Sequence, residues 1–453
     1  MQGLSTKKTL LMTSGNPAKR IIAFTLPLLA GEFLHVFYNM TDAFIVGRWL
    51  GINGLAAVGA SFSLIGFVYG FIFGLSGGLI IITTQRVGAE DEDGTRRSVA
   101  AVFFISLTVA VVFMTLLLPL VPHILTLMRT PSELHKNASD YVRIIFSSLG
   151  ITILYNILAG IIYAKGDSLR PFIFLIIGTA CNIILDTLFV VAFSWGVPGA
   201  ALATVISQLI SAILISGFIF RRFRSVLPRR QDWRVGWHEI QIHLSLGIAM
   251  GLQRSIVEVG NILVQTAING LGALTVAAVS AAQRVRALNM MPLFAVSRAV
   301  TTYTAQNYGA GKMDRVYKGL FQACLISLGL GVFMATVNQF TGEPIAALFL
   351  KDSPEAVALA HRYILYTGYT VFILGIMLVF RSTLQGLGMR RAPILCSVME
   401  TAMSILAAFV LIPRIGFTGV CLVNPLSWLA SGIPLYIAFG VWKRALLKIR
   451  TSI

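Results

Sequence analysis

The chain has 453 residues, of which 56% are hydrophobic and only 12% are charged, and it carries a formal net charge of +18. A soluble domain carries roughly 25% charged residues, so this composition excludes an ordinary soluble multidomain protein. Long apolar runs recur along the whole chain. Because about 20 such residues cross a bilayer core roughly 30 Å thick, the sequence predicts an all-α integral membrane protein.

The apolar runs predict twelve transmembrane helices. The first six lie near 21–47, 55–84, 99–121, 141–164, 171–194 and 198–220, and the second six near 243–269, 274–306, 317–342, 358–384, 393–413 and 417–441. Most Lys and Arg residues fall in segments that lie on one side of the membrane if the N-terminus is inside. The positive-inside rule then predicts a multi-pass protein of the cell (plasma) membrane with both termini cytoplasmic.

The most basic segment is RRFRSVLPRRQDWRVGW, Arg221 to Trp237. Basic residues interleaved with aromatics could suggest nucleic-acid binding, but in this chain they are better explained as topology determinants that lie against anionic lipid. The partners that we expect are therefore the lipid bilayer and a small molecule, and not nucleic acid. The four cysteines all lie in apolar spans without paired spacing, which favours neither disulfides nor a cysteine metal site, and we expect no cofactor.

An internal repeat divides the chain. TTQRVGA at 83–89 recurs as TAQNYGA at 304–310, and GVPGAALATVIS at 196–207 recurs as GFTGVCLVNPLS at 416–427. We expect an N-lobe over 1–220, a basic cytosolic linker over 221–242 and a C-lobe over 243–453. Six helices in each lobe give both lobes the same orientation, related by a pseudo-two-fold axis along the membrane normal, as in transporters that work by alternating access.

Two acids lie inside spans at a similar depth. Asp42 in the first span and Asp186 in the fifth are both expected roughly 9–12 Å from the outer end, at the level of Thr204 in the sixth. Asn182 shares a helix face with Asp186. Charged groups inside a membrane usually serve a function, and two carboxylates, an amide and a hydroxyl suit Na⁺ or, through protonation, H⁺.

The opening segment NPAKRIIAFTLPLLAGEFLHVFYNMTDAFIVGRWLG and the repeated AVGAS and Q-x-x-GA elements carry a family resemblance. The whole chain resembles the multidrug and toxic compound extrusion (MATE) family, and is closer to its DinF-like and MepA-like bacterial branch than to NorM. The resemblance implies a cation site at Asp42, Asn182, Asp186 and Thr204, in which Asp42 and Asp186 would bind Na⁺. It further implies that Tyr38 and Asn156 line the cavity of a monomeric antiporter, which exports amphiphilic organic cations in exchange for Na⁺ or H⁺.

The second half differs, because the repeat places Ser404 and Ala408 where Asn182 and Asp186 stand. Candidates for a substrate cavity in this half are Glu258, Gln283 and Arg284. Glu258 could equally form an internal ion pair with Arg254, four residues away.

Glu32 and His35 share a helix face in the first span. The pair is either a proton relay or a simple interhelical contact, and the sequence leaves both open.

Two other functions remain as alternatives. The motif GLSG at 74–77 matches a short pattern of intramembrane serine proteases, but glycine and serine commonly permit close helix packing, so we expect no enzyme. The nearer alternative is a flippase or exporter of anionic or lipid-linked cargo, which would use the arginines of the second half. A nucleotide-binding G-x-x-x-x-G-K-[ST] motif is absent, which favours coupling to an ion gradient.

Overall fold

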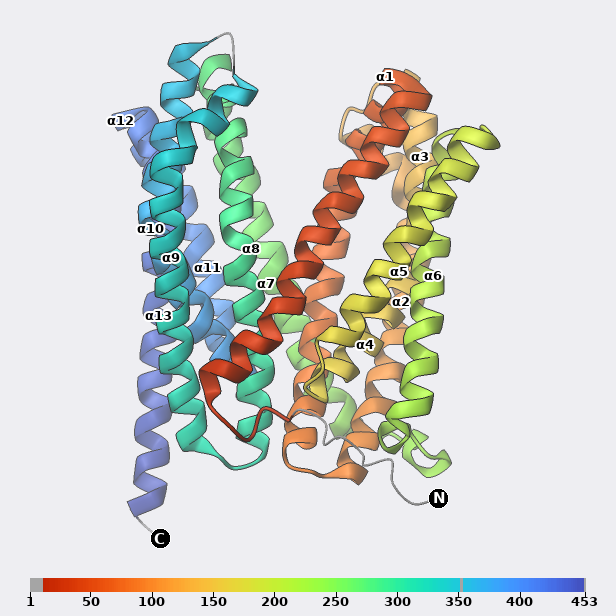
Figure 1. Cartoon of the computed structure of the whole chain (residues 1–453), viewed down its shortest axis with the longest axis vertical. Coiled ribbons are helices and arrows are strands. Elements are labelled where there is room, and N and C mark those ends of the chain that lie inside the picture. Colours follow the sequence, from red (N-terminus) through yellow and green to blue (C-terminus); the bar gives the residue numbers. More distant parts are fainter. Residues whose placement is uncertain (1–10, 351–352, 452–453) are drawn as a thin grey trace. The chain divides into compact units, whose positions relative to one another are not determined.

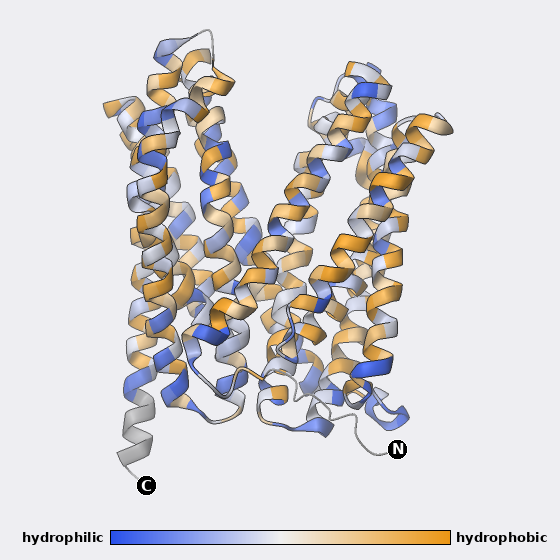
Figure 2. Ribbon diagram, viewed as in Figure 1, coloured by the Kyte–Doolittle hydropathy of each residue, from blue (hydrophilic) through white to orange (hydrophobic). Residues whose placement is uncertain are grey.

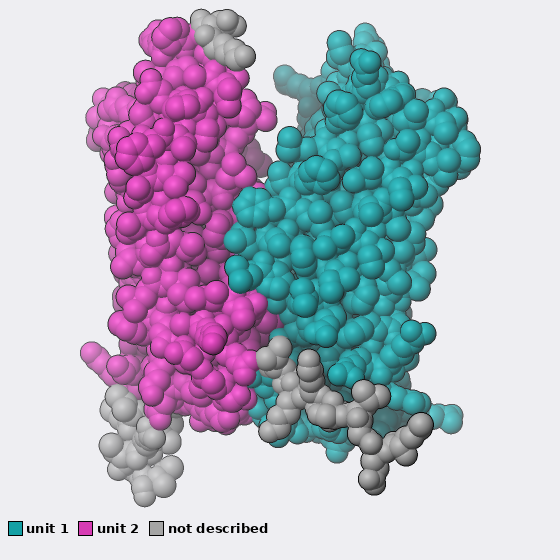
Figure 3. All heavy atoms as spheres, in the orientation of Figure 1, with its two compact units in different colours: residues 1–11, 26–251 teal, residues 12–25, 252–453 magenta. Residues whose placement is uncertain are grey.

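The computed structural model describes residues 11–350 and 353–451, and this part of the chain is helical without a strand. It forms two compact units, which are coloured separately in Figure 3. One unit contains Leu26–Gly251 and the other contains Met12–Thr25 together with the chain from Leu252 onward. Residues 1–10, 351–352 and 452–453 lie outside the described part, and the cytoplasmic position of both termini stays a prediction.

The first unit begins with the long helix α1, Pro17–Gly88 (Figure 1). Its backbone breaks at Gly51, where φ is 69° and ψ is −168°. Glycine reaches this region without steric penalty because it lacks a Cβ. The break divides α1 into two spans, as predicted for 21–47 and 55–84.

The rest of the first unit contains four further spans. The helix α2, Glu92–Leu127, starts at the N-cap Asp91, whose carboxylate accepts the Gly94 N–H at 2.8 Å. The predicted span 141–164 is not one straight helix, because α3, Ser132–Ser147, and α4, Leu149–Ala164, meet at a bend of 44°. The unit continues with α5, Leu169–Asp186, a π-helical turn η1, Thr187–Ala192, and α6, Gly196–Arg222.

The basic segment after α6 is folded against the first unit. It forms the short helices η2, Arg224–Val226, and η3, Arg230–Trp233. The buried Arg96 of α2 lies 3.5 Å from the Asp232 carboxylate and donates to the Ser225 carbonyl at 3.4 Å.

The second unit contains the remaining helices, and the helix α10 packs against α8, α9 and α13 (Figure 1). The helices that follow the basic segment are α7 Trp237–Asn269, α8 Ala273–Gly309, α9 Met313–Phe349, α10 Pro354–Gly386, α11 Arg391–Leu406, the π-helical turn η4 Ala407–Leu411, α12 Ile412–Ile415 and α13 Phe417–Thr451.

The described helices account for the twelve predicted spans. Eight are long and apolar enough to cross a membrane alone, and the bent pair α3–α4 adds a ninth. The break at Gly51 makes two spans of α1. The helices α7 and α8 complete the set, although neither is both apolar and poor enough in charged residues to count as a span by itself. The predicted all-helical membrane fold is confirmed.

Hydrophobic residues dominate the middle of the helices, whereas hydrophilic ones gather at their ends and in the connections (Figure 2). Many large apolar side chains are exposed on the outside, such as Leu127 at 84% and Phe340 at 75%. A soluble monomer rarely exposes so much contiguous apolar surface, whereas a membrane protein presents it to lipid.

Each half begins with a segment that packs in the other half's unit. Met12 donates its N–H to Gln306 Oε1 and Ala18 donates its N–H to Gln322 Oε1, both at 2.6 Å, within the second unit. The beginning of α7 packs in the first unit up to Gly251. There, a Cβ on Gly78 would lie 2.4 Å from the Leu246 carbonyl oxygen, so the two helices approach as closely as only glycine permits.

Candidate functional site

A cluster of polar side chains lies inside the first unit, formed by Asp42 of α1, Asn182 and Asp186 of α5, and Thr204 of α6. All four are buried, with exposed fractions between 0% for Asp186 and 8% for Thr204. Asp42 and Asp186 lie close enough to interact electrostatically. The structure therefore brings together the four residues that the sequence predicted as a cation site.

Five buried polar atoms of this cluster have no hydrogen-bond partner in the described part of the chain. They are Oδ1 of Asp42, both carboxylate oxygens of Asp186 and both amide atoms of Asn182. Buried polar groups are normally satisfied, and leaving one unsatisfied costs about 1–3 kcal/mol. Oxygens gathered in this way are the groups that a hard cation or a proton would satisfy.

Two tyrosines border the cluster. The Tyr38 hydroxyl lies 3.0 Å from the Thr204 hydroxyl, a hydrogen bond that joins α1 to α6. Tyr38 and Tyr141 both interact electrostatically with Asp42 and Asp186. Tyr38 thus belongs to the wall of the cluster and positions Thr204.

The backbone at Asp186 changes from an α-helix to the π-helical turn η1. Such turns are frequent at functional sites. The same kind of turn recurs in the second half as η4, which contains Ala408, the residue that the sequence repeat pairs with Asp186. The turn is therefore a feature of the repeated fold, and the carboxylate is what distinguishes the first unit.

The remaining candidates of the first half are Asn156, Glu32 and His35, and the contacts described here do not connect them to the cluster around Asp42. Asn156 donates to the Thr152 carbonyl of its own helix at 2.8 Å, and the Thr152 hydroxyl donates to Gln208 at 2.7 Å. Glu32 is half-buried and His35 is exposed. The structure assigns neither a relay nor a purely structural role to that pair.

The second unit has neutral groups where the first has its acids. The Ser404 and Ser427 hydroxyls lie 2.8 Å apart, and Asn424, which occupies the position of Thr204, donates to the Tyr363 hydroxyl at 2.8 Å. These groups satisfy one another, which leaves them less suited to hold an ion.

The charged candidates of the second half have partners of their own. Glu258 lies 3.9 Å from Arg254 and accepts a hydrogen bond from Asn261 at 3.1 Å. The guanidinium of Arg284 lies over the Phe349 ring, 5.3 Å from its centroid, and Gln283 is half-buried.

Sequence reasoning missed a polar cluster at the end of α1, around Glu239 of α7. Arg86 donates to both Glu239 oxygens, at 2.5 and 2.9 Å. The fully buried His243 donates through Nδ1 to the Leu79 carbonyl at 2.7 Å, and its Nε2 lies 3.1 Å from Ser98 Oγ and 3.2 Å from Glu239. Arg86 belongs to the repeated motif TTQRVGA, which was the only sequence signal for this cluster.

The electrostatics of Glu239 follow from these contacts. Burial opposes ionisation, but hydrogen bonds from His243 and Arg86 outweigh it and lower the pKa of Glu239 from 4.5 to about 2. The ionised carboxylate therefore holds the beginning of α7 against α1 and α2.

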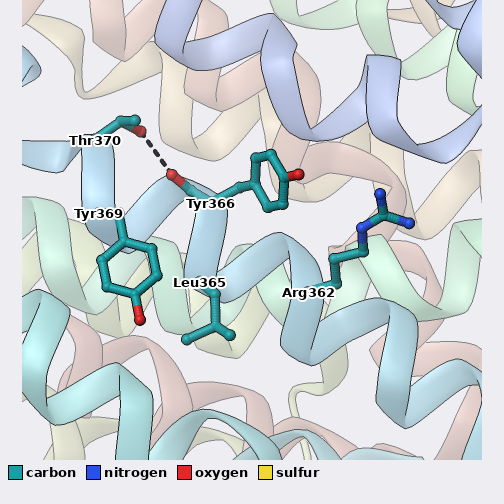
Figure 4. Close-up of a pocket in the computed structure, with 5 residues that line it drawn as sticks. All are labelled: Arg362, Leu365, Tyr366, Tyr369 and Thr370. Atoms are coloured by element: carbon teal, nitrogen blue, oxygen red, sulfur yellow. Dashed lines mark hydrogen bonds between the residues drawn. The ribbon is translucent and has the colours of Figure 1, made fainter.

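A shallow hollow of about 350 Å³ lies on α10 of the second unit (Figure 4). It is lined by Arg362, Leu365, Tyr366, Tyr369 and Thr370, and the Thr370 hydroxyl donates to the Tyr366 carbonyl within the same helix. Arg362 donates to the Thr418 hydroxyl at 2.8 Å. None of the sequence-predicted site residues lines this hollow.

Among the described residues, no group of three or more His, Cys, Asp or Glu side chains is arranged to hold a metal ion. A cation in the first unit would instead depend on two carboxylates with an amide and a hydroxyl. Na⁺ accepts such oxygen ligands, both charged and neutral, as hard cations generally do.

Comparison with known proteins connects this geometry to one family. The MatE family model matches residues 27–188 and 249–410, so it matches the chain once in each half. The chain is 26% identical to the "Probable multidrug resistance protein YpnP" of Bacillus subtilis, over 83% of this chain and 84% of that protein. It is 24% identical to the "Multidrug export protein MepA" of Staphylococcus haemolyticus, over 89% and 88% of the two chains.

Solved structures agree on the fold. The structure described as "Crystal structure of MATE in the bent conformation" matches with a TM-score of 0.90 at 21% identity and covers 99% of this chain and all of that one. The double match of the family model confirms the internal repeat found in the sequence.

Proposed function

Because the chain belongs to the MatE family, we propose that it is a secondary active transporter for multidrug efflux, which exports amphiphilic organic cations in exchange for Na⁺ or H⁺. The multidrug names of its relatives support the general activity. The coupling ion and the cationic substrate class are inferences from this chain's own residues. We expect the protein to work as a monomer in the cell membrane, with both termini cytoplasmic.

One observation carries the coupling proposal, namely the five unpartnered polar atoms on Asp42, Asn182 and Asp186. Without an ion, two carboxylates buried side by side repel each other and lack hydrogen-bond donors. Either Na⁺ or a proton removes the repulsion. The cluster is therefore more stable with one bound cation than when it is empty. The second half has Ser404 and Ala408 at the positions that the repeat makes equivalent, which supports ion coupling through the first unit.

Ion binding drives transport only if the two conformations of the transporter bind the ion differently. Asp42 and Thr204 lie on α1 and α6, and the Tyr38–Thr204 hydrogen bond joins these helices. A rearrangement of α1 against α6 would therefore change the ligand set of the ion. We propose that such a rearrangement couples the ion to release of the substrate.

The test is ion-driven transport in proteoliposomes with Asp42→Asn and Asp186→Asn. At about 4 Å and an effective dielectric constant of ~20, one charge contributes about 4 kcal/mol before desolvation is subtracted. A net loss of about 2–3 kcal/mol would weaken ion binding roughly 30- to 150-fold. Efflux of an organic cation should fail in either variant, and the double variant should be little worse, because the two groups act as a unit.

The matched control is Glu133→Gln, which removes an exposed carboxylate at the start of α3. It should transport as the wild type does. If the Asp42→Asn variant transports at the wild-type rate under both a sodium and a proton gradient, the proposed coupling site is wrong.

A second candidate is export of anionic cargo, which the arginines in the polar helices α7 and α8 favour. Arg284 lies over Phe349, and Arg286 contacts Met290 Sδ at 3.7 Å. Phe349 and Met290 are neutral, so these contacts do not compensate the positive charges of the two arginines. Transport of an anionic but not a cationic substrate by the wild type would favour this candidate.

A further inference from the structure

A largely buried pair of opposite charges lies in the second unit, between α10 and α11. Arg381 Nη1 is 3.7 Å from Glu400 Oε2, and each side chain is only 13% exposed. Arg381 lies roughly 8 Å from the end of α10 at Gly386, and Glu400 roughly 14 Å from the start of α11 at Arg391, at about 1.5 Å per residue. Both groups therefore lie within the membrane-spanning part of the unit.

Neither member of the pair is satisfied by the other. A separation of 3.7 Å is too long for a hydrogen bond, and Oε2 of Glu400 is a buried atom without a donor. A guanidinium has five N–H donors, and Arg381 directs one of them to the Met377 thioether at 3.3 Å. A buried ion pair is stable only when its remaining donors and acceptors are satisfied, so this pair is incomplete on its own.

The surroundings hold one further positive charge. Glu400 interacts electrostatically with Arg381 of α10 and with Arg254 of α7. On its own helix it is near Cys396, whose thiol contacts Met377 Sδ at 3.8 Å. From α13, hydroxyl groups face α11, such as that of Ser427.

The helices at this point are held by neutral hydrogen bonds that do not involve the charge pair. Gln253 donates to the Pro393 carbonyl and accepts from Gln385, both at 2.8 Å. Thr401 donates to the Ile256 carbonyl at 3.0 Å. Because α7, α10 and α11 are joined in this way, the charge pair is not needed to hold them together.

We propose that Arg381 and Glu400 form a carboxylate-binding site, at which a substrate carboxylate takes the place of Glu400 on the Arg381 guanidinium while Glu400 takes up one proton. The proposal rests on the proposed function for the amphiphilic nature of its ligand, whose carboxylate would belong to a zwitterionic amphiphile that also carries an amine. The charges balance, because the bound anion compensates Arg381 and the proton neutralises Glu400. No covalent bond to the substrate forms or breaks.

The geometry favours a carboxylate over other groups. The planar guanidinium presents parallel N–H donors that match two carboxylate oxygens, and such bidentate pairs are among the strong hydrogen bonds. The neighbouring Arg254 is 54% exposed and lies over the Phe294 ring at 5.9 Å, so it can meet an approaching anion beside an aromatic surface. Glu258, 38% exposed, could receive the amine of a zwitterionic substrate.

The probe for the test is 2-naphthoate, with 2-naphthamide as a neutral compound of the same shape. Binding is measured by calorimetry on the full-length protein in nanodiscs, across a range of pH and in buffers with different ionisation enthalpies. We expect naphthoate to bind with uptake of about one proton, and its affinity to fall about tenfold per pH unit above the titration of Glu400. Naphthamide should bind weakly and without dependence on pH.

Two variants separate the roles. Arg381→Gln should weaken naphthoate binding about 10- to 100-fold, the range for a hydrogen bond to a charged group. Glu400→Gln imitates the protonated acid, so it should bind naphthoate without proton uptake and with the same affinity at every pH. The control Arg414→Gln removes an exposed arginine of α12 and should bind as the wild type does.

Three results would overturn the site. Naphthoate binding by Arg381→Gln at wild-type affinity would exclude the guanidinium as the anion ligand. Proton uptake that persists in Glu400→Gln would place the proton elsewhere. A wild type that binds naphthoate no better than naphthamide would leave the pair as a structural ion bridge, and this measurement does not depend on whether either variant folds.

This test is independent of the coupling proposal because it uses no ion gradient. The double variant Asp42→Asn with Asp186→Asn should still bind naphthoate with proton uptake. If wild-type efflux fails while naphthoate behaves as described, the proposed antiport is wrong and the carboxylate site stands. If wild-type efflux succeeds but naphthoate binds without proton uptake, only the proposed carboxylate site is wrong.

Discussion

The contact between Glu239 and Arg86 permits a quantitative prediction about the first unit. Each tenfold change in proton affinity corresponds to about 1.4 kcal/mol. A pKa of Glu239 lowered from 4.5 to about 2 therefore amounts to at most roughly 3–4 kcal/mol of stability. The Glu239 side chain is 17% exposed, so water screens part of this interaction, and we expect about 2 kcal/mol.

Glu239→Gln should therefore lower the melting temperature in detergent by about 4–8 °C at pH 7, since a unit of this size loses about 2–4 °C per kcal/mol. The effect has a defined pH dependence. The folded pKa lies below the unfolded one, so the stabilisation is complete above about pH 4.5 and disappears as the pH falls toward 2. The melting temperatures of the variant and the wild type should accordingly converge in acid.

The matched control is Glu92→Gln. Glu92 also pairs with an arginine, Arg96, at 3.7 Å, but its side chain is 67% exposed. Exposed pairs contribute about 0–1 kcal/mol, so the control should melt within about 2 °C of the wild type. The reasoning is refuted if Glu239→Gln loses no more than Glu92→Gln, or if its deficit at pH 7 is unchanged at pH 3.

Three further predictions concern packing, the ion site and topology. Gly78→Ala should destabilise the first unit by about 2 kcal/mol or more, because its Cβ would strike a backbone carbonyl of α7, whereas Gly66→Ala meets nothing within 4 Å and should be neutral or stabilising in thermal unfolding. Tyr38→Phe removes the hydrogen bond to Thr204 and should weaken ion binding about 3- to 10-fold in equilibrium binding, without abolishing transport; an unchanged affinity would remove Tyr38 from the site. A cysteine at Arg230 should react with an impermeant maleimide only from the cytosolic side, and labelling of intact cells would reverse the predicted orientation.

The sequence predicted that Asp42 and Asp186 lie close together because depth in a membrane follows from position along a helix. Asp42 and Asp186 were placed at one level by counting residues, and the structure places them within electrostatic range. The repeat was equally visible, and the family model matches the chain once in each half. Helix geometry and the cost of burying charge were sufficient for the two acids, and recurring motifs were sufficient for the repeat.

Contacts between side chains of different helices could not be predicted from the sequence in this way. Arg86 and Glu239 are separated by 153 residues, and nothing in either local sequence specifies their contact. Arg381 and Glu400 lie on neighbouring helices, but their pairing depends on how α10 rotates about its axis. The bend between α3 and α4 was missed because Ser148, where the helix ends, is compatible with a continuous apolar run.

Each half of the chain begins with a segment that packs in the other half's unit, and this arrangement affects how the protein folds during synthesis. Met12 emerges early from the ribosome, yet its partner Gln306 follows 294 residues later. Translation proceeds at about 5–20 residues per second, so roughly 15–60 s pass between the synthesis of Met12 and that of Gln306. During that interval the six helices of the first half are already in the bilayer while the leading segment stays unbound. A chaperone or a lipid surface that protects residues near 12–25 during translation would therefore raise the yield of folded transporter, and a chain cut within 221–236 would need both pieces synthesised together.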